Sequence, residues 1–299
     1  MKFRTAAGAV TALAAAAAIL MTAGAVVASA ATERSGHHGR GVPTSKISIQ
    51  LYTFAEYVGF GSDAATQARL EEVLSRLSAM GYRNVEPFTF NGLTALQFRA
   101  LLDKHHLKAP AEHTSIDEAT WGQTLADAKT IGVRYLGAGA TPRDFTTAQQ
   151  WIDYAHVLNR LGKAARRKGL RLMVHNHDWD FAQTFGRVRA YDLLMKHTDP
   201  RYMVFQLDLY WAVTGGADPV DVIRRYGNRI KLFHVKDRGV GGRIEIVGEG
   251  DIDFRRIFRA AGGRIDYYAV EHDPRFGDAT FDPFEAAQKG FTYLDQVRF

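Results

Sequence analysis

The sequence predicts a single (β/α)8 TIM barrel over residues 46–299, and two observations predict it. Short apolar runs alternate eight times with longer amphipathic runs, which is typical of parallel strands joined by helices. Eight such units close most simply into a barrel, and the length is near the usual size of that fold. An open doubly wound sheet is the alternative. It would need a glycine-rich turn after the first strand, and Gly59–Ser62 does not provide one.

The expected strands are short and rich in apolar residues. They lie at Ile47–Thr53, Arg83–Phe88, Leu107–His113, Arg134–Gly139, Leu170–His175, Tyr202–Asp208, Ile230–Lys236 and Ile265–Glu271. The expected helices follow them at Ala64–Met80, Thr94–His105, Ile116–Ile131, Thr146–Lys168, Ala190–His197, Pro219–Tyr226, Phe254–Ala261 and Pro283–Val297. Gly81, Gly132 and Gly169 each end a predicted helix, as left-handed C-terminal caps do.

The first 45 residues are expected to lie outside the barrel. Residues 1–30 begin with Lys2 and Arg4, continue with an uncharged run and end in Ala28-Ser29-Ala30, which is typical of a cleaved secretory signal peptide. We therefore expect a secreted, extracellular protein with no stable membrane association after cleavage. A retained membrane anchor is the alternative, because the run is long enough to span a bilayer. Residues 31–45 are rich in Gly, Ser, His and Arg and predict a disordered leader.

The charge and the missing motifs narrow the function classes. The net charge is +6, and the densest basic run, Arg160–Arg171, favours a solvated helix face over a nucleic-acid site. No nucleic-acid partner is expected. The chain has no glycine-rich phosphate loop, no G-x-S-x-G motif and no cysteine. The oligomeric state is open.

Potential metal ligands end four consecutive predicted strands. They are His175, Asp208, His234 and Glu271, at the end of the barrel where active sites lie. We expect them to bind one divalent ion, because first-row metals accept mixed imidazole and carboxylate ligands. Mn²⁺ is favoured, with Co²⁺, Fe²⁺, Zn²⁺ or Mg²⁺ as alternatives. If the register of the fifth strand is wrong by two residues, His177 takes the place of His175.

Other polar and aromatic residues near the strand ends are candidates for catalysis or substrate contact. Glu271, His177, Lys236 and Asp180 are the catalytic candidates, with Lys236 as a cation for enolate charge or, alternatively, a rim lysine. The substrate-binding candidates are Glu86, His113, Trp179 and Trp211, for each of which structural packing is the alternative.

Several motifs carry a family resemblance. They are ISIQLYTF at 47–54, GYRNVEPF at 81–88, FQLDLYW at 205–211, KLFHVKD at 231–237, VGEGDID at 247–253 and YYAVEHD at 267–273. With them the chain resembles, from residue 46 to its end, the xylose-isomerase-like barrels grouped as sugar phosphate isomerases/epimerases. That family usually binds one metal through Glu, Asp, His and Glu. Asp208, His234 and Glu271 match the last three places, and His175 stands where the first Glu is usual.

The resemblance implies a secreted metal-dependent isomerase or epimerase. It would act on a keto-sugar or free sugar by removing a proton next to a carbonyl that the metal holds. Because His175 replaces one of the two glutamates that epimerases of this family use, a lyase or dehydratase is the first alternative, acting on a 3-keto-glycoside or keto-inositol. A non-catalytic sugar-binding protein is the second. An abasic-site endonuclease would need more ligands and a more basic groove.

Overall fold

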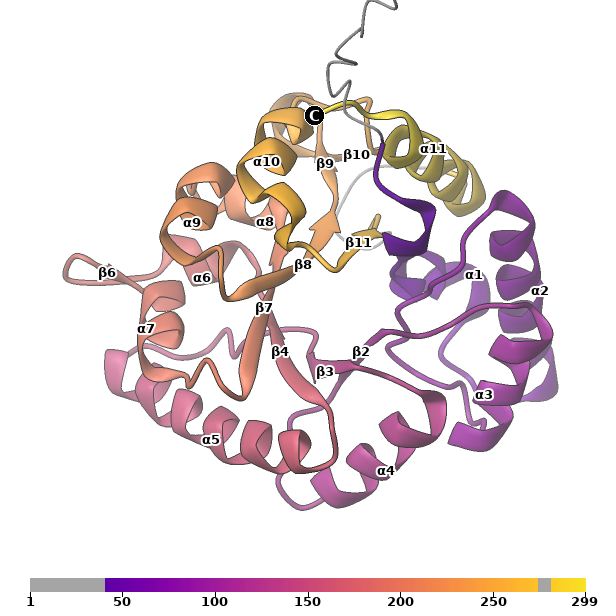
Figure 1. The fold of residues 1–299 in the computed structure, drawn as a ribbon, viewed down its shortest axis with the longest axis horizontal. Coiled ribbons are helices and arrows are strands. Elements are labelled where there is room, and N and C mark those ends of the chain that lie inside the picture. The colour runs from indigo at the N-terminus through magenta and orange to yellow at the C-terminus, as the bar shows by residue number, and fades with distance from the viewer. Residues whose placement is uncertain (1–40, 274–280) are drawn as a thin grey trace, which may run out of the picture. The chain divides into compact units, whose positions relative to one another are not determined.

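The computed structural model of the chain describes residues 41–273 and 281–299. Its centre is a parallel sheet of seven assigned strands surrounded by helices (Figure 1). The strand order is β1-β11-β8-β7-β4-β3-β2, so each strand lies beside its neighbours in the chain and the last pairs with the first. The strands are β1 (Ile47–Ile49), β2 (Ala111–Thr114), β3 (Tyr135–Ala138), β4 (Arg171–His175), β7 (Met203–Asp208), β8 (Ile230–Val235) and β11 (Tyr267–Val270).

Residues 84–86 occupy the eighth place and close the barrel. Asn84 bridges to Lys108, and Glu86 bridges to Gln50, both in parallel. Regular pairing is short here because Pro87 has no N–H to donate. The Asn84 side chain also donates to the carbonyls of Ser45 and Ile47, at 3.0 and 2.9 Å. The predicted fold is therefore confirmed, with a shorter second strand than expected.

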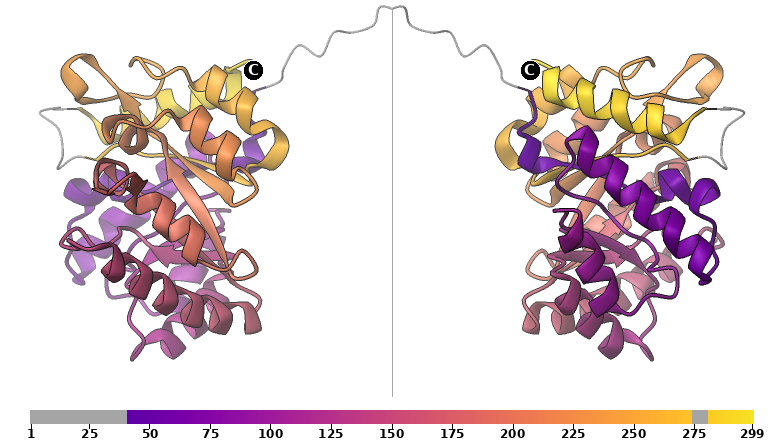
Figure 2. Two further views of the ribbon diagram at one scale, coloured as in Figure 1. Left: turned by 90° about the vertical axis from the view of Figure 1, so that its left-hand side faces the viewer. Right: turned by 90° about the vertical axis from the view of Figure 1, so that its right-hand side faces the viewer.

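The helices form the outer layer, as the side views show (Figure 2). The main ones are α2 (Ala64–Met80), α3 (Ala95–Lys104), α4 (Trp121–Ile131), α5 (Ala148–Arg167), α7 (Ala190–His197), α9 (Pro219–Tyr226), α10 (Phe254–Ala261) and α11 (Pro283–Gln296). Short helices α1 (Ala55–Val58), α6 (Asp178–Ala182) and α8 (Leu209–Thr214) follow strand ends. Side chains at their N-caps hold several helix starts; Asp63, for example, accepts from the backbone N–H of Thr66.

Small irregular elements complete the described chain. Two antiparallel pairs, β5 (Thr184–Phe185) with β6 (Val188–Arg189) and β9 (Asp237–Arg238) with β10 (Ile244–Glu245), lie outside the barrel sheet. The β5–β6 hairpin projects beyond the helices (Figure 1). The 3-10 helices are η1 (Thr44–Lys46), η2 (Leu51–Phe54), η3 (Val240–Gly242) and η4 (Gly262–Arg264).

Several boundaries differ from the sequence prediction; the strand expected from Leu107 begins at Ala111, for example, and the helix expected from Ile116 begins at Trp121. Two further differences have a clear structural cause. The first strand was expected to reach Thr53, but the chain turns into η2 after Gln50, whose side-chain oxygen accepts from the N–H of Tyr52 at 3.1 Å. The disordered leader was expected to reach residue 45. Val42, however, is buried and its N–H bonds to the carbonyl of Leu294 at 2.8 Å, so ordered structure includes this residue. The predicted signal peptide and the rest of the leader lie outside the described residues.

The barrel interior changes from apolar to polar along the strands. Ala111, Tyr135, Met173, Val204 and Leu232 form one buried cluster, with one residue from each of five strands. Because side chains two residues apart share a side of a strand, the next inward positions hold His113, His175, Gln206 and His234. The pleat of the sheet therefore directs these polar side chains to the carboxyl end of the barrel.

None of the helices in the described ranges has both the length and the apolar character needed to cross a bilayer.

Glu112 gives the fold a testable pH dependence. This residue of β2 is 5% exposed, and burial followed by the charge of Asp127 raises the pKa of its carboxyl to about 8. An unfolded chain would lose this proton near the ordinary pKa of 4.5, so the stabilisation is fully present below that pH and is lost as the pH rises towards 8. Glu112→Gln should abolish this loss and gain several kcal/mol relative to the parent between pH 5 and pH 8.5, since one pKa unit corresponds to about 1.4 kcal/mol.

Urea unfolding at the two pH values measures the difference. Glu56→Gln, at an exposed glutamate, is the matched control and should change stability equally at both. A Glu112→Gln effect that does not depend on pH would contradict the assignment.

Candidate active site at the carboxyl ends of the strands

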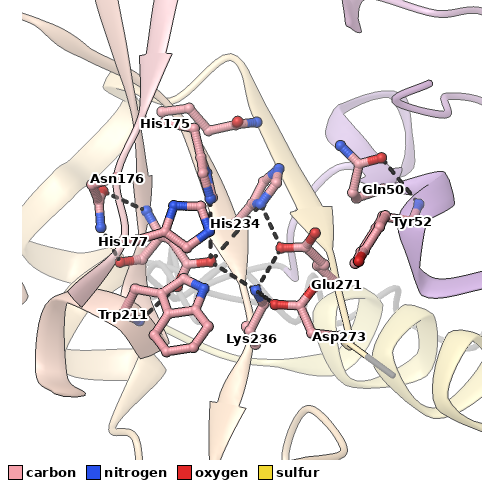
Figure 3. Close-up of polar contacts among 12 residues, drawn as sticks. Gln50, Tyr52, His175, Asn176, His177, Trp211, His234, Lys236, Glu271 and Asp273 are labelled. Atoms are coloured by element: carbon pink, nitrogen blue, oxygen red, sulfur yellow. Dashed lines mark hydrogen bonds and ion pairs between the residues drawn. The ribbon is translucent and has the colours of Figure 1, made fainter. Parts of the chain in front are cut away.

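Four buried side chains meet where β4, β7, β8 and β11 end. His175, Asp208, His234 and Glu271 each offer one ligand atom, and these atoms lie within 4.8 Å of one another. His175 Nε2 is 4.0 Å and His234 Nδ1 is 3.9 Å from Asp208 Oδ2. His234 Nδ1 is 2.7 Å from Glu271 Oε2 (Figure 3). The structure thus brings together the four residues expected to bind a metal, with His175 rather than His177 in the group.

This donor set fits a divalent metal. Metal bonds of about 2.0–2.3 Å place neighbouring ligand atoms roughly 3–4 Å apart, near the spacings around Asp208 Oδ2. Its other oxygen, Oδ1, accepts from the backbone N–H of Trp211 at 2.8 Å, while Oδ2 accepts no hydrogen bond and is aimed into the cluster. Burial, aided by His234, holds the pKa of His175 well below its usual value, so its ring is neutral and free to act as a ligand.

Glu86 holds His234 from behind. Its Oε1 lies 2.7 Å from His234 Nε2, which leaves Nδ1 facing Asp208 and Glu271. A carboxylate that orients the far nitrogen of a ligating histidine is a common feature of metal centres. Burial lowers the pKa of His234, but Glu271 and Glu86 outweigh burial and raise it to about 10, so these surroundings favour positive charge.

Glu86 itself is fully engaged and 1% exposed. It accepts from Gln50 at 2.9 Å and from Gln206 at 2.8 Å, and His113 Nε2 lies 3.0 Å away. Burial would raise its pKa, but His234 and His113 together hold the pKa well below the usual range. The sequence had suggested that Glu86 contacts substrate. In the structure it does not line the cavity and instead orients the ring of His234.

Lys236 lies beside the four-residue cluster. Its Nζ is 2.6 Å from Asp273, 2.8 Å from Glu271 and 3.2 Å from Asp208 (Figure 3). Burial opposes its charge, but these three carboxylates outweigh burial and raise the pKa of Lys236 well above its usual value. The side chain is 1% exposed, so Lys236 is a buried cation and not a rim lysine.

A cavity of about 240 Å³ opens over the cluster. Its lining comes from several strand ends and comprises Tyr52, Phe88, His113, Gly139, Ala140, His175, His177, Lys236, Glu271 and Asp273. A larger surface hollow of about 470 Å³, which Arg187 and Asp192 help to line, lies near the β5–β6 hairpin and contains none of the clustered residues. The smaller cavity is the candidate active site, because it alone of the two borders the cluster that could hold a metal ion.

The expected residues divide into those that line this cavity and those that lie behind it. His113, His177, Lys236 and Glu271 line it, whereas Asp180, Trp179 and Trp211 do not. Asp180 accepts from the backbone N–H of His177 at 2.8 Å and from Thr141 Oγ1 at 2.9 Å. Trp179 stacks on the His177 ring with centroids 4.3 Å apart. Asp180 and Trp179 thus position His177 instead of reaching the cavity.

Five residues that line the cavity were not predicted as site residues, namely Tyr52, Phe88, Gly139, Ala140 and Asp273, and two of them, Tyr52 and Asp273, carry polar side-chain groups. Asp273 follows Glu271 by two residues, so strand alternation places both on one side, and that signal was present in the sequence. Tyr52 lies in η2, and its position depends on the turn after Gln50, whereas the sequence predicted a continuous strand over Ile47–Thr53.

Comparison with known proteins decides the family. The sequence model of the xylose isomerase-like TIM barrels matches residues 74–294. The chain belongs to this family. An inosose dehydratase from Clostridium tetani is 33% identical over 172 residues, which are 50% of this chain and 55% of that protein. The match therefore spans about half the length of this curated relative.

Solved structures agree on the fold. A sugar phosphate isomerase/epimerase from Parabacteroides distasonis has a TM-score of 0.67 at 24% identity, over 84% of this chain and 94% of the other. The IolI protein, whose structure has a bound zinc atom, has a TM-score of 0.62 at 19% identity, over 83% of this chain and 96% of the other.

The metal centre of this xylose isomerase-like barrel can be tested by metal content. Asp208→Ala and His234→Ala each remove one of four ligands, and either should lower bound divalent metal from one ion per chain to a small fraction. Elemental analysis after dialysis measures this. Asp221→Ala, at an exposed aspartate, is the control. Full metal content in both site variants would refute the assignment.

The variant His175→Glu tests whether His175 is one of the metal ligands. It should retain one ion per chain and raise the affinity for Mn²⁺ relative to Zn²⁺, because a carboxylate oxygen replaces an imidazole nitrogen. His156→Glu, at an exposed histidine, should leave the preference unchanged. If the preference of His175→Glu also stays unchanged, His175 is not a ligand.

Proposed function

We propose that this chain is a metal-dependent lyase that eliminates water from a keto-inositol or keto-sugar. The carrying observation is the asymmetry of the cavity. Glu271 and Asp273 supply carboxylates from the end of β11, while β4 supplies only the imidazoles of His175 and His177. Elimination needs a base and an acid, whereas epimerisation with two glutamates needs carboxylates on opposite faces of one carbon.

Two comparisons support this proposal, the first for elimination and the second for a bound metal. The relative at 33% identity is an inosose dehydratase, and the IolI structure contains zinc. The cavity volume of about 240 Å³ suits one six-membered ring, and none of the described residues that line it is an arginine, which favours an unphosphorylated substrate. The ligand set of His175, Asp208, His234 and Glu271 would hold the ion, which when bound polarises the substrate carbonyl and makes the neighbouring C–H acidic.

The side chains would divide the remaining work. Glu271 is the base: burial would raise its pKa, but His234 and Lys236 outweigh burial and keep it ionised. It takes the proton next to the carbonyl. Burial raises the pKa of the Asp273 carboxyl to about 6, so this carboxyl can hold a proton and give it to the departing hydroxyl as the C–O bond breaks, which releases water. The Lys236 ammonium, between the two carboxylates, offsets the negative charge that develops on the substrate. Because Glu271 and Asp273 come from one strand end, we expect syn elimination.

An epimerase or isomerase is the second candidate. It is favoured by His177, which lines the cavity and whose Nδ1 has no hydrogen-bond partner. This atom could return a proton to the substrate carbon. It ranks second because β4 supplies no carboxylate to the cavity that could act on the face of the substrate carbon opposite Glu271.

The reaction can be read by NMR in D₂O with metal-loaded protein and a panel of keto-inositols and 3-keto-glycosides. An unsaturated product supports the lyase. Deuterium at an inverted carbon without elimination supports the epimerase instead. Asp273→Asn should lower the elimination rate about 100-fold or more with metal content unchanged, as expected for loss of an acid. Neither exchange nor elimination, with metal bound, would favour a sugar-binding protein.

We also propose that residues 1–30 direct export and are removed. An unphosphorylated substrate is consistent with action outside the cell. Expression of the full chain in a secreting bacterium should give protein in the medium that begins at Ala31, as determined by N-terminal sequencing. Protein that keeps residues 1–30 in the membrane fraction would indicate an anchor.

A further inference from the structure

A basic residue lies at the start of every strand of the barrel or shortly before it. Within three residues of the eight strand starts lie Lys46, Arg83, Lys108, Arg134, Arg171, Arg201, Arg229 and Arg264. Lys231 adds a ninth cation as the second residue of β8. Because all strands are parallel, their starts meet at one end of the barrel, opposite the active site. We call this set of nine residues the basic end.

Little negative charge offsets the basic end. Asp266 lies 3.7 Å from Arg134, and Asp199 lies 2.5 Å from Arg201. Other members of the set bond to neutral carbonyls, which leaves their charge in place; Lys46, for example, donates to Ile265 at 2.6 Å. In the described part of the chain, the ammonium groups of Lys108 and Lys231 have neither a hydrogen bond nor an ion pair.

Helix dipoles explain only part of this pattern. Basic residues stabilise helix C-termini, which lie at the same end, and Lys104, Arg166 and Arg167 fit that role in the last turns of their helices. Lys108 and Arg134, however, lie beyond the helices and donate to no helix carbonyl. Both line a hollow of about 750 Å³, together with Lys46, Arg83 and His106. Arg83 also donates to the carbonyl of Ser78 in the last turn of α2, so helix ends account for Arg83 but not for Lys108 and Arg134.

The shape of the basic end restricts its partner. The connections that enter β3, β4 and β8 are only three residues long, at 132–134, 168–170 and 227–229, so they offer no projecting element to enter a duplex groove. The exposed large hydrophobic residues of the described ranges are Phe60, Leu96, Val188 and Val240, and all lie on segments that follow strands, at the other end. The basic end thus lacks an apolar anchor for a membrane.

We propose that the basic end docks a linear phosphate polymer. A thin flexible polyanion can follow a low ring of cations and enter the hollow beside Lys108 and Arg134. Its binding would depend mainly on charge, since none of the exposed large hydrophobic residues in the described ranges lies at this end. Docking there would leave the cavity with Glu271 and Lys236 open to substrate at the opposite end, so the chain could be retained on a polymer while it acts on a small molecule.

The test measures binding of inorganic polyphosphate to the full chain by calorimetry at low and high salt. Binding should weaken steeply with salt, because displaced counterions drive it. The triple variant Lys108→Gln, Arg134→Gln, Lys231→Gln should lose about tenfold or more at low salt and show a shallower salt dependence. The side chains of these three residues donate no hydrogen bond to a backbone carbonyl in the described part of the chain, so the fold should tolerate their replacement. Unchanged metal content would verify that the variant is folded.

A matched triple variant separates this site from net charge. Arg187→Gln, Arg243→Gln and Arg255→Gln remove three exposed charges from segments that follow strands, at the other end. This control should bind within about twofold of the parent. Equal losses in the two triple variants, no binding of the parent at low salt, or stronger binding at equal phosphate to duplex DNA or phosphatidylglycerol vesicles would each overturn the proposal.

Discussion

The Glu86 carboxylate is the interaction on which the centre of the barrel depends. It is buried and contacts Gln50, His113, Gln206 and His234, which belong to four other strands or strand ends. An ionised carboxylate in an apolar interior is costly unless its oxygens are paired. Here each oxygen has partners from elements far apart in sequence, so the charge is tolerated only when the barrel is closed. The same contacts fix the ring of His234 and thereby the direction of its Nδ1.

The charges of the neighbouring cluster around Lys236 and Asp208 depend on that arrangement. Asp208, Glu271 and Asp273 surround the Lys236 ammonium, while His175 and His234 face Asp208. The carboxylates exceed the one permanent cation among them, and the raised pKa of His234 shows the surplus. A divalent ion would offset this surplus with the ligands already in place. The site is therefore suited to a cation because of its buried charges, independently of any family pattern.

Strand alternation explains which parts of this centre could be predicted from the sequence. The parallel units and the inward positions of His175, Asp208, His234 and Glu271 follow from chain order and a period of two. The roles of Glu86 and Asp180 do not. Glu86 looked like a strand-end polar residue, but its partners lie on strands whose register the sequence does not specify. Asp180 looked free to reach substrate, yet its bonds to Thr141 and the backbone of His177 depend on how two loops pack. Local patterns predict direction along a strand, whereas these contacts depend on packing between segments.

The two ends of the barrel carry different polar groups for the same topological reason. In a parallel barrel, the residues at the amino ends of all strands lie at one end of the barrel, and the residues at the carboxyl ends lie at the other. In this chain the finishes supply imidazoles and carboxylates inside a cavity, and the starts supply lysines and arginines on the surface. Buried acids at one end need a compensating cation nearby, and Lys236 provides one within 3.2 Å of Asp208. The exposed cations of the other end have water as their alternative partner, so their charge is not needed for folding. That contrast is the physical reason to assign the buried cluster around Asp208 and Glu271 to chemistry and the basic end to a partner outside the chain.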